Sequence, residues 1–144
     1  MTDVETLQEC RMAAMEERAI SRQIERLAMI GGPRGVGSQA MEPAGDRKTN
    51  NATAAHLQKL DGLIDKLVKM RDENVDIMLR AEEVIEKVKD HRERVIIRCY
   101  YVEGESDYEI AAQMELTAQR IQQVRNKTIE GLSVKNKKHI GKLY

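Results

Sequence analysis

The chain has 144 residues, its 24 lysines and arginines balance 24 aspartates and glutamates, and 33% of its residues are charged. It contains no phenylalanine and no tryptophan, which excludes a large aromatic core and favours long amphipathic helices packed through aliphatic and methionine side chains. No signal peptide and no apolar run of membrane-spanning length is present, so we expect a soluble, cytoplasmic protein of one ordinary domain or two small ones.

The first segment of the chain, residues 1–30, is predicted to form one helix with a discontinuous apolar stripe. Residues 31–51 hold five of the nine glycines and both prolines, so we expect a flexible loop there. Arg34, Arg47 and Lys48 give this loop a basic character. A basic arm that enters a DNA minor groove is one interpretation, but a plain flexible connector is the favoured one.

Residues 52–90 are predicted to form a long amphipathic helix. Its apolar residues follow a spacing of three and four, with a second set that widens the stripe on one side. We expect the first helix to fold back over this one as a hairpin, which leaves the second apolar side for another copy of the chain. The sequence therefore predicts a homodimer or a higher ring. Arg71 and Asn74 interrupt the stripe, and they either fix the register of the coil or face solvent.

Residues 91–133 contain the most informative pattern, two short helices joined by a tight corner. Ser106 and Glu109 form a capping box, which predicts a helix start. The corner is at residues 114–116, and Thr117 is a good N-cap for a second helix over residues 117–132. Ile121 and Val124 begin an apolar repeat of helical spacing along it, so the whole segment is predicted to be an all-α helix-turn-helix domain.

The opposite face of the predicted 117–132 helix is polar in an unusual way. It carries amides and cations without the glutamate–lysine pairs of an ordinary solvated helix. Glutamine and asparagine can form paired hydrogen bonds with adenine, and arginine with guanine, in the major groove. From residue 118 to 144 seven basic residues accompany one acidic residue, whereas residues 103–115 carry five acids and no base. This charge asymmetry favours a DNA-binding face that continues into a basic tail at residues 134–144. The alternative is a basic tail that has no binding target.

The stretch from Ser106 to Ile129 resembles region four of bacterial sigma factors, through Glu-Ile-Ala in the capped helix, Leu-Thr after the turn and Gln-Arg-Ile-Gln-Gln-Val beyond it. The chain as a whole resembles phage and prophage regulators of the RinA/ArpU kind. That resemblance implies an activator of late phage genes that acts in a bacterial host cell. Such a regulator is expected to contact host RNA polymerase or another regulator as a second partner. Glu115, Ala118 and Gln119 depart from the sigma pattern, so the sigma target sequence is not carried over.

The predicted function is therefore sequence-specific recognition of double-stranded DNA in transcription regulation. A small terminase subunit that recognises the packaging site is an alternative, and a structural or scaffolding coiled-coil protein is a second one. The predicted base-reading residues are Gln119, Arg120, Gln122 and Gln123. The predicted phosphate contacts are Thr117, Arg125, Asn126 and Lys127.

We expect no enzymatic activity, no metal and no cofactor. Cys10 and Cys99 are far apart and are interpreted as free thiols, and the three histidines show no ligand spacing with them. The alternating acids Glu103, Glu105, Asp107 and Glu109 raise the alternative of a magnesium-dependent nuclease. We disfavour it because these acids suit a helix start and no lysine or histidine accompanies them as a general acid or base.

Overall fold

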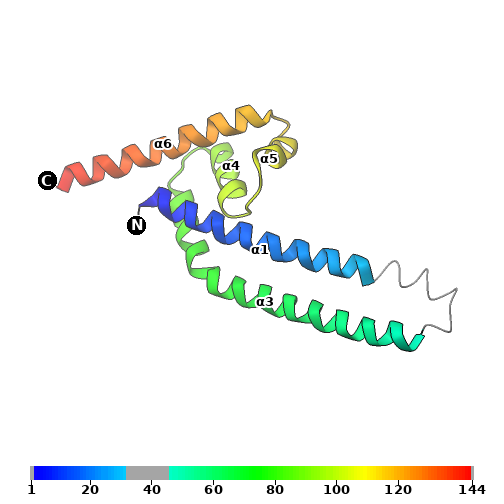
Figure 1. Cartoon of the computed structure of the whole chain (residues 1–144). Helices are drawn as coiled ribbons and strands as arrows, with labels where there is room; N and C mark the ends of the chain where they lie inside the picture. Colours follow the sequence, from blue (N-terminus) through cyan, green and yellow to red (C-terminus); the bar gives the residue numbers. More distant parts are fainter. Residues whose placement is uncertain (1, 32–45, 144) are drawn as a thin grey trace. The chain divides into compact units, whose positions relative to one another are not determined.

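The computed structural model describes residues 2–31 and 46–143, with side chains described for residues 2–29 and 53–134. Its elements are five helices, α1 (Asp3–Gly31), α3 (Asp46–Glu86), α4 (His91–Tyr101), α5 (Asp107–Met114) and α6 (Ala118–Leu143), and no strand occurs among the described residues (Figure 1). The all-α prediction is confirmed. None of the helices in this described part combines the length and the apolar character that a membrane span needs.

Three helix boundaries differ from those predicted. α3 begins at Asp46 and ends at Glu86, so residues 46–51 are helical where a loop was expected. The last glycine or proline before this point is Gly45, and the next one, Gly62, lies well inside the helix. α6 continues to Leu143, well beyond the predicted end at residue 132, because no proline follows and lysine is a good helix former. The proposed minor-groove residue Arg34 lies outside the described residues, as do the side chains of Arg47, Lys48 and residues 135–144 of the basic tail.

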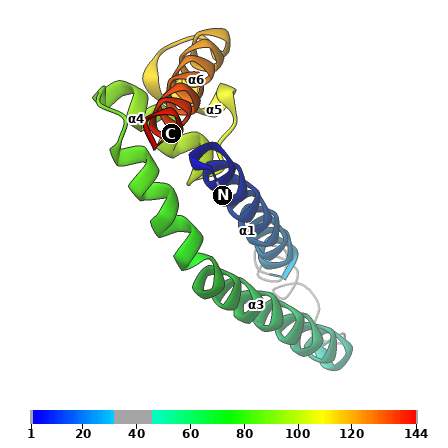
Figure 2. The ribbon, with the colours of Figure 1, turned by 90° about the vertical axis from the view of Figure 1, so that its left-hand side faces the viewer.

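The chain divides into two compact units, one made of Met1–Glu16 with Asn74–Tyr144 and the other of Glu17–Glu73. The second unit consists of the later turns of α1 and the earlier turns of α3, which run alongside each other in opposite directions (Figures 1 and 2). The His56 ring nitrogen Nε2 lies 2.6 Å from the carbonyl oxygen of Leu27, and Arg71 Nε lies 3.5 Å from a Glu17 carboxylate oxygen. Ile20 and Leu67 are the buried hydrophobic residues described in this unit.

The first unit has two hydrophobic clusters. The larger one joins the first turns of α1 to the end of α3, to α4 and to α6, and its members are Leu7, Cys10, Ala81, Val84, Ile85, Val88, Ile97, Tyr101 and Leu132. The smaller one lies among α4, α5 and α6, which contact one another, and its members are Ile96, Ile110, Ala111 and Ile121. Together these clusters hold α6 against the rest of the unit through one side of that helix.

The loop between α4 and α5 is closed by a left-handed glycine. Gly104 has φ 70°, and the following Glu105 N–H donates to the Cys99 carbonyl at 3.0 Å. This bond closes a seven-residue turn at the end of α4, and glycine adopts the left-handed conformation within it without a side-chain clash. It turns the chain so that α5 starts at Asp107 beside α4.

Candidate nucleic-acid interface

The start of α5 is fixed by a capping box, as predicted. The Ser106 hydroxyl accepts from the Glu109 N–H at 3.2 Å, and the Ser106 N–H donates to the Glu109 carboxylate at 3.3 Å. Both groups satisfy backbone donors that a helix start leaves unpaired. Ile110 and Ala111 then enter the smaller cluster, so the orientation of α5 is set by both its cap and its buried side.

Three residues connect α5 to α6. Glu115 is the C-cap of α5 and has the left-handed conformation, with φ 56°. Leu116 packs against the smaller cluster, so its side chain turns inward. The Thr117 hydroxyl accepts from the Arg120 N–H at 3.1 Å, so Thr117 caps α6.

The side of α6 that faces the unit is apolar. Ile121, Thr128 and Leu132 are buried and Val124 is half-buried. The Thr128 hydroxyl donates to the Val124 carbonyl at 2.9 Å, so its polar atom is satisfied within the helix. The helical period then turns the residues between these positions outward.

The outward side, which we call the α6 face, contains most of the residues predicted to read DNA. Six of the eight predicted site residues are exposed on it: Gln119, Arg120, Gln122, Gln123, Asn126 and Lys127. Within the described part of the chain, the side-chain amides of the three glutamines have no hydrogen-bond partner. Thr117, also exposed, lies at the first turn of the same helix. The glutamines are therefore available to an external ligand and are not packed in the core.

Arg125 differs from the other seven predicted site residues. Its Nη2 lies 3.0 Å from Asp107 Oδ2 and its Nε lies 3.3 Å from Oδ1, and the two side chains are only 13% and 22% exposed. Burial lowers the pKa of the Arg125 guanidinium, but Asp107 and the adjacent tyrosines raise it by more, so the group is protonated. This pairing turns Arg125 toward α5 and away from the α6 face.

Tyr100 connects Arg125 to the first helix. Its ring lies between two guanidinium groups, with the Arg11 Cζ 3.6 Å and the Arg125 Cζ 4.0 Å from the ring centroid. Arg11 Nη1 also donates to the carbonyl oxygens of Tyr100 and, at 2.9 Å, of Glu105. This arrangement, the Arg11–Tyr100–Arg125 stack, combines cation–π attraction with hydrogen bonds to the loop after α4. Sequence reasoning missed it, since Arg11 and Tyr100 show no local pattern that would pair them.

The acids considered for a nuclease have partners of another kind. Glu109 belongs to the cap, Asp107 holds Arg125, and Glu105 Oε2 accepts from Gln113 at 2.6 Å. Glu103 is exposed. No group of three or more histidine, cysteine or acidic side chains in the described residues has the arrangement of a metal site.

Neither Cys10 nor Cys99 forms a disulfide bond, as predicted. Cys10 is buried, whereas Cys99 is half-buried. Burial raises the pKa of the Cys99 thiol, and Glu105 and Glu103 add to the effect. A protonated, partly buried thiol is a poor nucleophile, so Cys99 contributes to packing.

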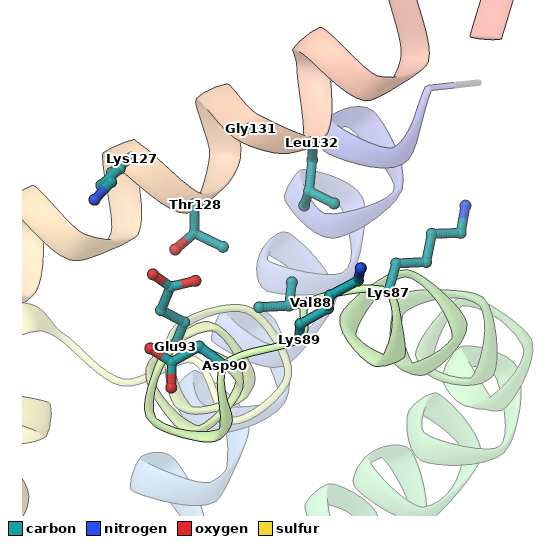
Figure 3. Close-up of a pocket in the computed structure, with 9 residues that line it drawn as sticks. All are labelled: Lys87, Val88, Lys89, Asp90, Glu93, Lys127, Thr128, Gly131 and Leu132. Atoms are coloured by element: carbon teal, nitrogen blue, oxygen red, sulfur yellow. The ribbon is translucent and has the colours of Figure 1, made fainter. Parts of the chain in front are cut away.

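A cavity of about 290 Å³ borders one edge of the α6 face (Figure 3). Lys127 and Gly131 of α6 line it, together with Lys87 and Lys89 from the turn between α3 and α4. Val88, Leu132 and Thr128 also line the cavity, as do the acids Asp90 and Glu93. Lys87 is paired with Asp3 at 3.0 Å and the Asp90 carboxylate caps α4, which leaves Lys89 and Lys127 as the cations at this edge.

Comparison with known proteins adds no relative, because no family model, no curated protein and no solved structure matches the chain. The function is therefore inferred from the arrangement of α5 and α6 and from the side chains of the α6 face.

Proposed function

We propose that the protein is a sequence-specific DNA-binding regulator of transcription and that α5 and α6 act as a helix-turn-helix, with α6 in the major groove. The observation that carries the proposal is the α6 face. It presents three glutamines, an asparagine and two cations to solvent along one side of a helix whose other side is buried. Amides and guanidinium groups in this arrangement have the donors and acceptors that distinguish base pairs.

In this proposal the side chains divide into two roles. Base readout is assigned to Gln119, Arg120, Gln122 and Gln123. Phosphate contact is assigned to Thr117, Asn126 and Lys127, and Arg125 is reassigned as a positioning residue because its guanidinium is held by Asp107. Lys89, which lines the same cavity as Lys127, adds positive charge at one edge of the α6 face. Of the acids near α5, Glu105, Asp107 and Glu109 are engaged in a hydrogen bond, an ion pair and a cap.

The resemblance to sigma region four and to phage late-gene regulators supports a role at promoters, with host RNA polymerase as a second partner. A second copy of the chain is the other partner proposed. α3 leaves Leu57, Ile64 and Val68 exposed, and an apolar row of this kind on a long helix favours self-association.

Packaging-site recognition by a small terminase subunit is the alternative that the same exposed row allows. A packaging protein is expected to assemble into a ring of many copies, whereas a promoter regulator is expected to form a dimer or tetramer. The molar mass of the purified protein in solution, measured by light scattering, distinguishes the two. A protein that associates but has no affinity for any duplex at moderate salt would be a structural coil instead.

The proposal is tested by selecting duplexes from a random pool with the purified protein and measuring affinity for the selected sequence. Changing Gln122 and Gln123 together to alanine is expected to cost ~1–3 kcal/mol for each base contact that is lost and to relax the sequence preference. Gln58→Ala is the matched control, because Gln58 is an exposed glutamine on α3. Unchanged affinity and preference in the double variant would remove base readout from the α6 face.

A further inference from the structure

The segment of α3 between residues 57 and 71 has two apolar sides, and only one is covered. Leu67 is buried and Leu60, Leu63 and Met70 are half-buried, and these form the side toward α1. Leu57, Ile64 and Val68 are 51%, 41% and 54% exposed. Their spacing of seven and four places them in a single row along the helix, which we call the open row.

Two charged residues belong to the open row. Asp61 stands between Leu57 and Ile64, and Arg71 follows Val68 by three residues, so both continue the helical spacing. Asp61 is exposed. Arg71 reaches Glu17 through Nε at 3.5 Å, yet its side chain remains 60% exposed. The row therefore carries one negative charge toward its beginning and one positive charge at its end.

We infer that the open row binds the open row of a second copy in the antiparallel direction, with Ile64 opposite Val68 of the second copy. This deepens the self-association proposed above and rests on it. Asp61 is three residues before Ile64 and Arg71 is three residues after Val68. The same register therefore brings Asp61 opposite Arg71 of the second copy, and the twofold axis repeats each pair. Apolar residues meet apolar residues and opposite charges meet.

The charges disfavour the parallel register. Two copies aligned in parallel would place Asp61 against Asp61 and Arg71 against Arg71, and like charges brought together in this way oppose association. A charged pair inside an apolar row also penalises every slipped register, because slipping leaves one charge against an aliphatic side chain. The orientation is therefore set by Asp61 and Arg71, and the attraction comes from the three apolar residues.

The first test is the dimer dissociation constant, measured by analytical ultracentrifugation. Asp61→Arg places two arginines opposite each other at both ends of the antiparallel row and is expected to weaken association by about tenfold or more. Glu73→Arg is the matched control, since Glu73 is an exposed acid of the same helix that lies outside the open row. It makes the same change in charge and is expected to leave association unchanged. In a parallel pair, Asp61→Arg would only exchange one repulsion for another.

Cross-linking gives an independent test of direction. In a chain with Cys10→Ala and Cys99→Ser, an equimolar mixture of Ile64→Cys and Val68→Cys is expected to form a disulfide-linked dimer more readily than either variant alone. The bond needs Cα atoms closer than about 7 Å, which the antiparallel register provides only between the two different positions.

The outcomes distinguish failure of self-association from failure of the antiparallel register. A wild-type chain that stays monomeric at all concentrations overturns both self-association and this register, while DNA binding by the α6 face is measured separately and is unaffected. A chain that associates but tolerates Asp61→Arg, or that cross-links through Ile64→Cys alone, overturns the antiparallel register only. Circular dichroism of each variant confirms that helix content is retained.

Discussion

Arg125 and Lys127 are two residues apart on α6 and have opposite surroundings. Arg125 is paired with Asp107 and lies over the Tyr100 ring, whereas Lys127 is exposed. The sequence placed both among the phosphate contacts because both are cations of one helix. The helical period separates their directions, and the partner of Arg125 is on another helix. A local pattern could therefore predict the α6 face but not the exception within it.

The first prediction contrasts these two cations. Lys127→Ala is expected to reduce the dependence of log affinity on log salt by about 0.9, the value for one lost phosphate contact on duplex DNA. Arg125→Met should leave that slope unchanged at temperatures where the variant is folded, but it should lower the free energy of unfolding by ~1.5–3 kcal/mol, because it removes charged hydrogen bonds to Asp107. Salt titrations of binding and urea unfolding curves measure the two effects. A reduced salt slope in Arg125→Met would return Arg125 to the phosphate contacts.

At the scale of the elements, the turn between α5 and α6 has a glutamate at a position with a left-handed backbone conformation. Glu115 adopts φ 56°, a conformation that costs an L-residue with a side chain roughly 1–2 kcal/mol and that glycine adopts freely. In the sequence, Glu115 is noted only as a departure from the sigma pattern. Only the structure shows that Glu115 is the residue in the left-handed region.

Glu115→Gly is therefore expected to raise the free energy of unfolding by ~0.5–1 kcal/mol, after allowing for the greater entropy of glycine in the unfolded chain. Thermal unfolding followed by circular dichroism measures the change. Glu130→Gly is the control, because Glu130 is an exposed glutamate inside α6, where glycine is expected to lower stability by ~1 kcal/mol. Equal destabilisation by both substitutions would contradict the role given to the turn.

Element starts were predictable where a side chain caps the helix. Ser106 with Glu109, and Thr117, are local signals that act over three residues, and both helices begin where these signals place them. Element ends were less predictable. α6 passes the last residue of its apolar repeat and continues to Leu143, because no proline marks an end at residue 132.

For the whole molecule, the least predictable feature is the composition of the first unit. Residues 3–16 pack with residues from 74 onward, and Leu7 and Cys10 share a cluster with Tyr101 and Leu132. The amphipathic pattern indicated that the first helix had a buried side. It could not indicate that the first turns contact α4 and α6, since that contact depends on tertiary geometry.

Leu7→Ala is expected to destabilise the first unit by ~2–5 kcal/mol, the usual cost of an aliphatic cavity in a core. Hydrogen exchange of the α5 and α6 amides measures this loss of stability. Their protection should fall although Leu7 is a hundred or more residues away in the sequence. Met12→Ala, on the same helix but with a side chain that is 67% exposed, should leave that protection within ~0.5 kcal/mol of wild type. Loss of protection confined to α1 would contradict a shared core.

The Arg11–Tyr100–Arg125 stack has a consequence for biosynthesis. Leu7, Cys10 and Arg11 leave the ribosome early, but their partners Tyr100 and Leu132 are translated late. The apolar side of the first helix therefore stays exposed to solvent until the later helices have been synthesised. By the same logic, an excised fragment that begins at residue 74 would lack the Arg11 guanidinium over Tyr100 and would leave Ile97 and Tyr101 without Leu7 and Cys10 as packing partners. Such a minimal reader should aggregate, and supplying residues 2–16 as a separate peptide should restore its solubility.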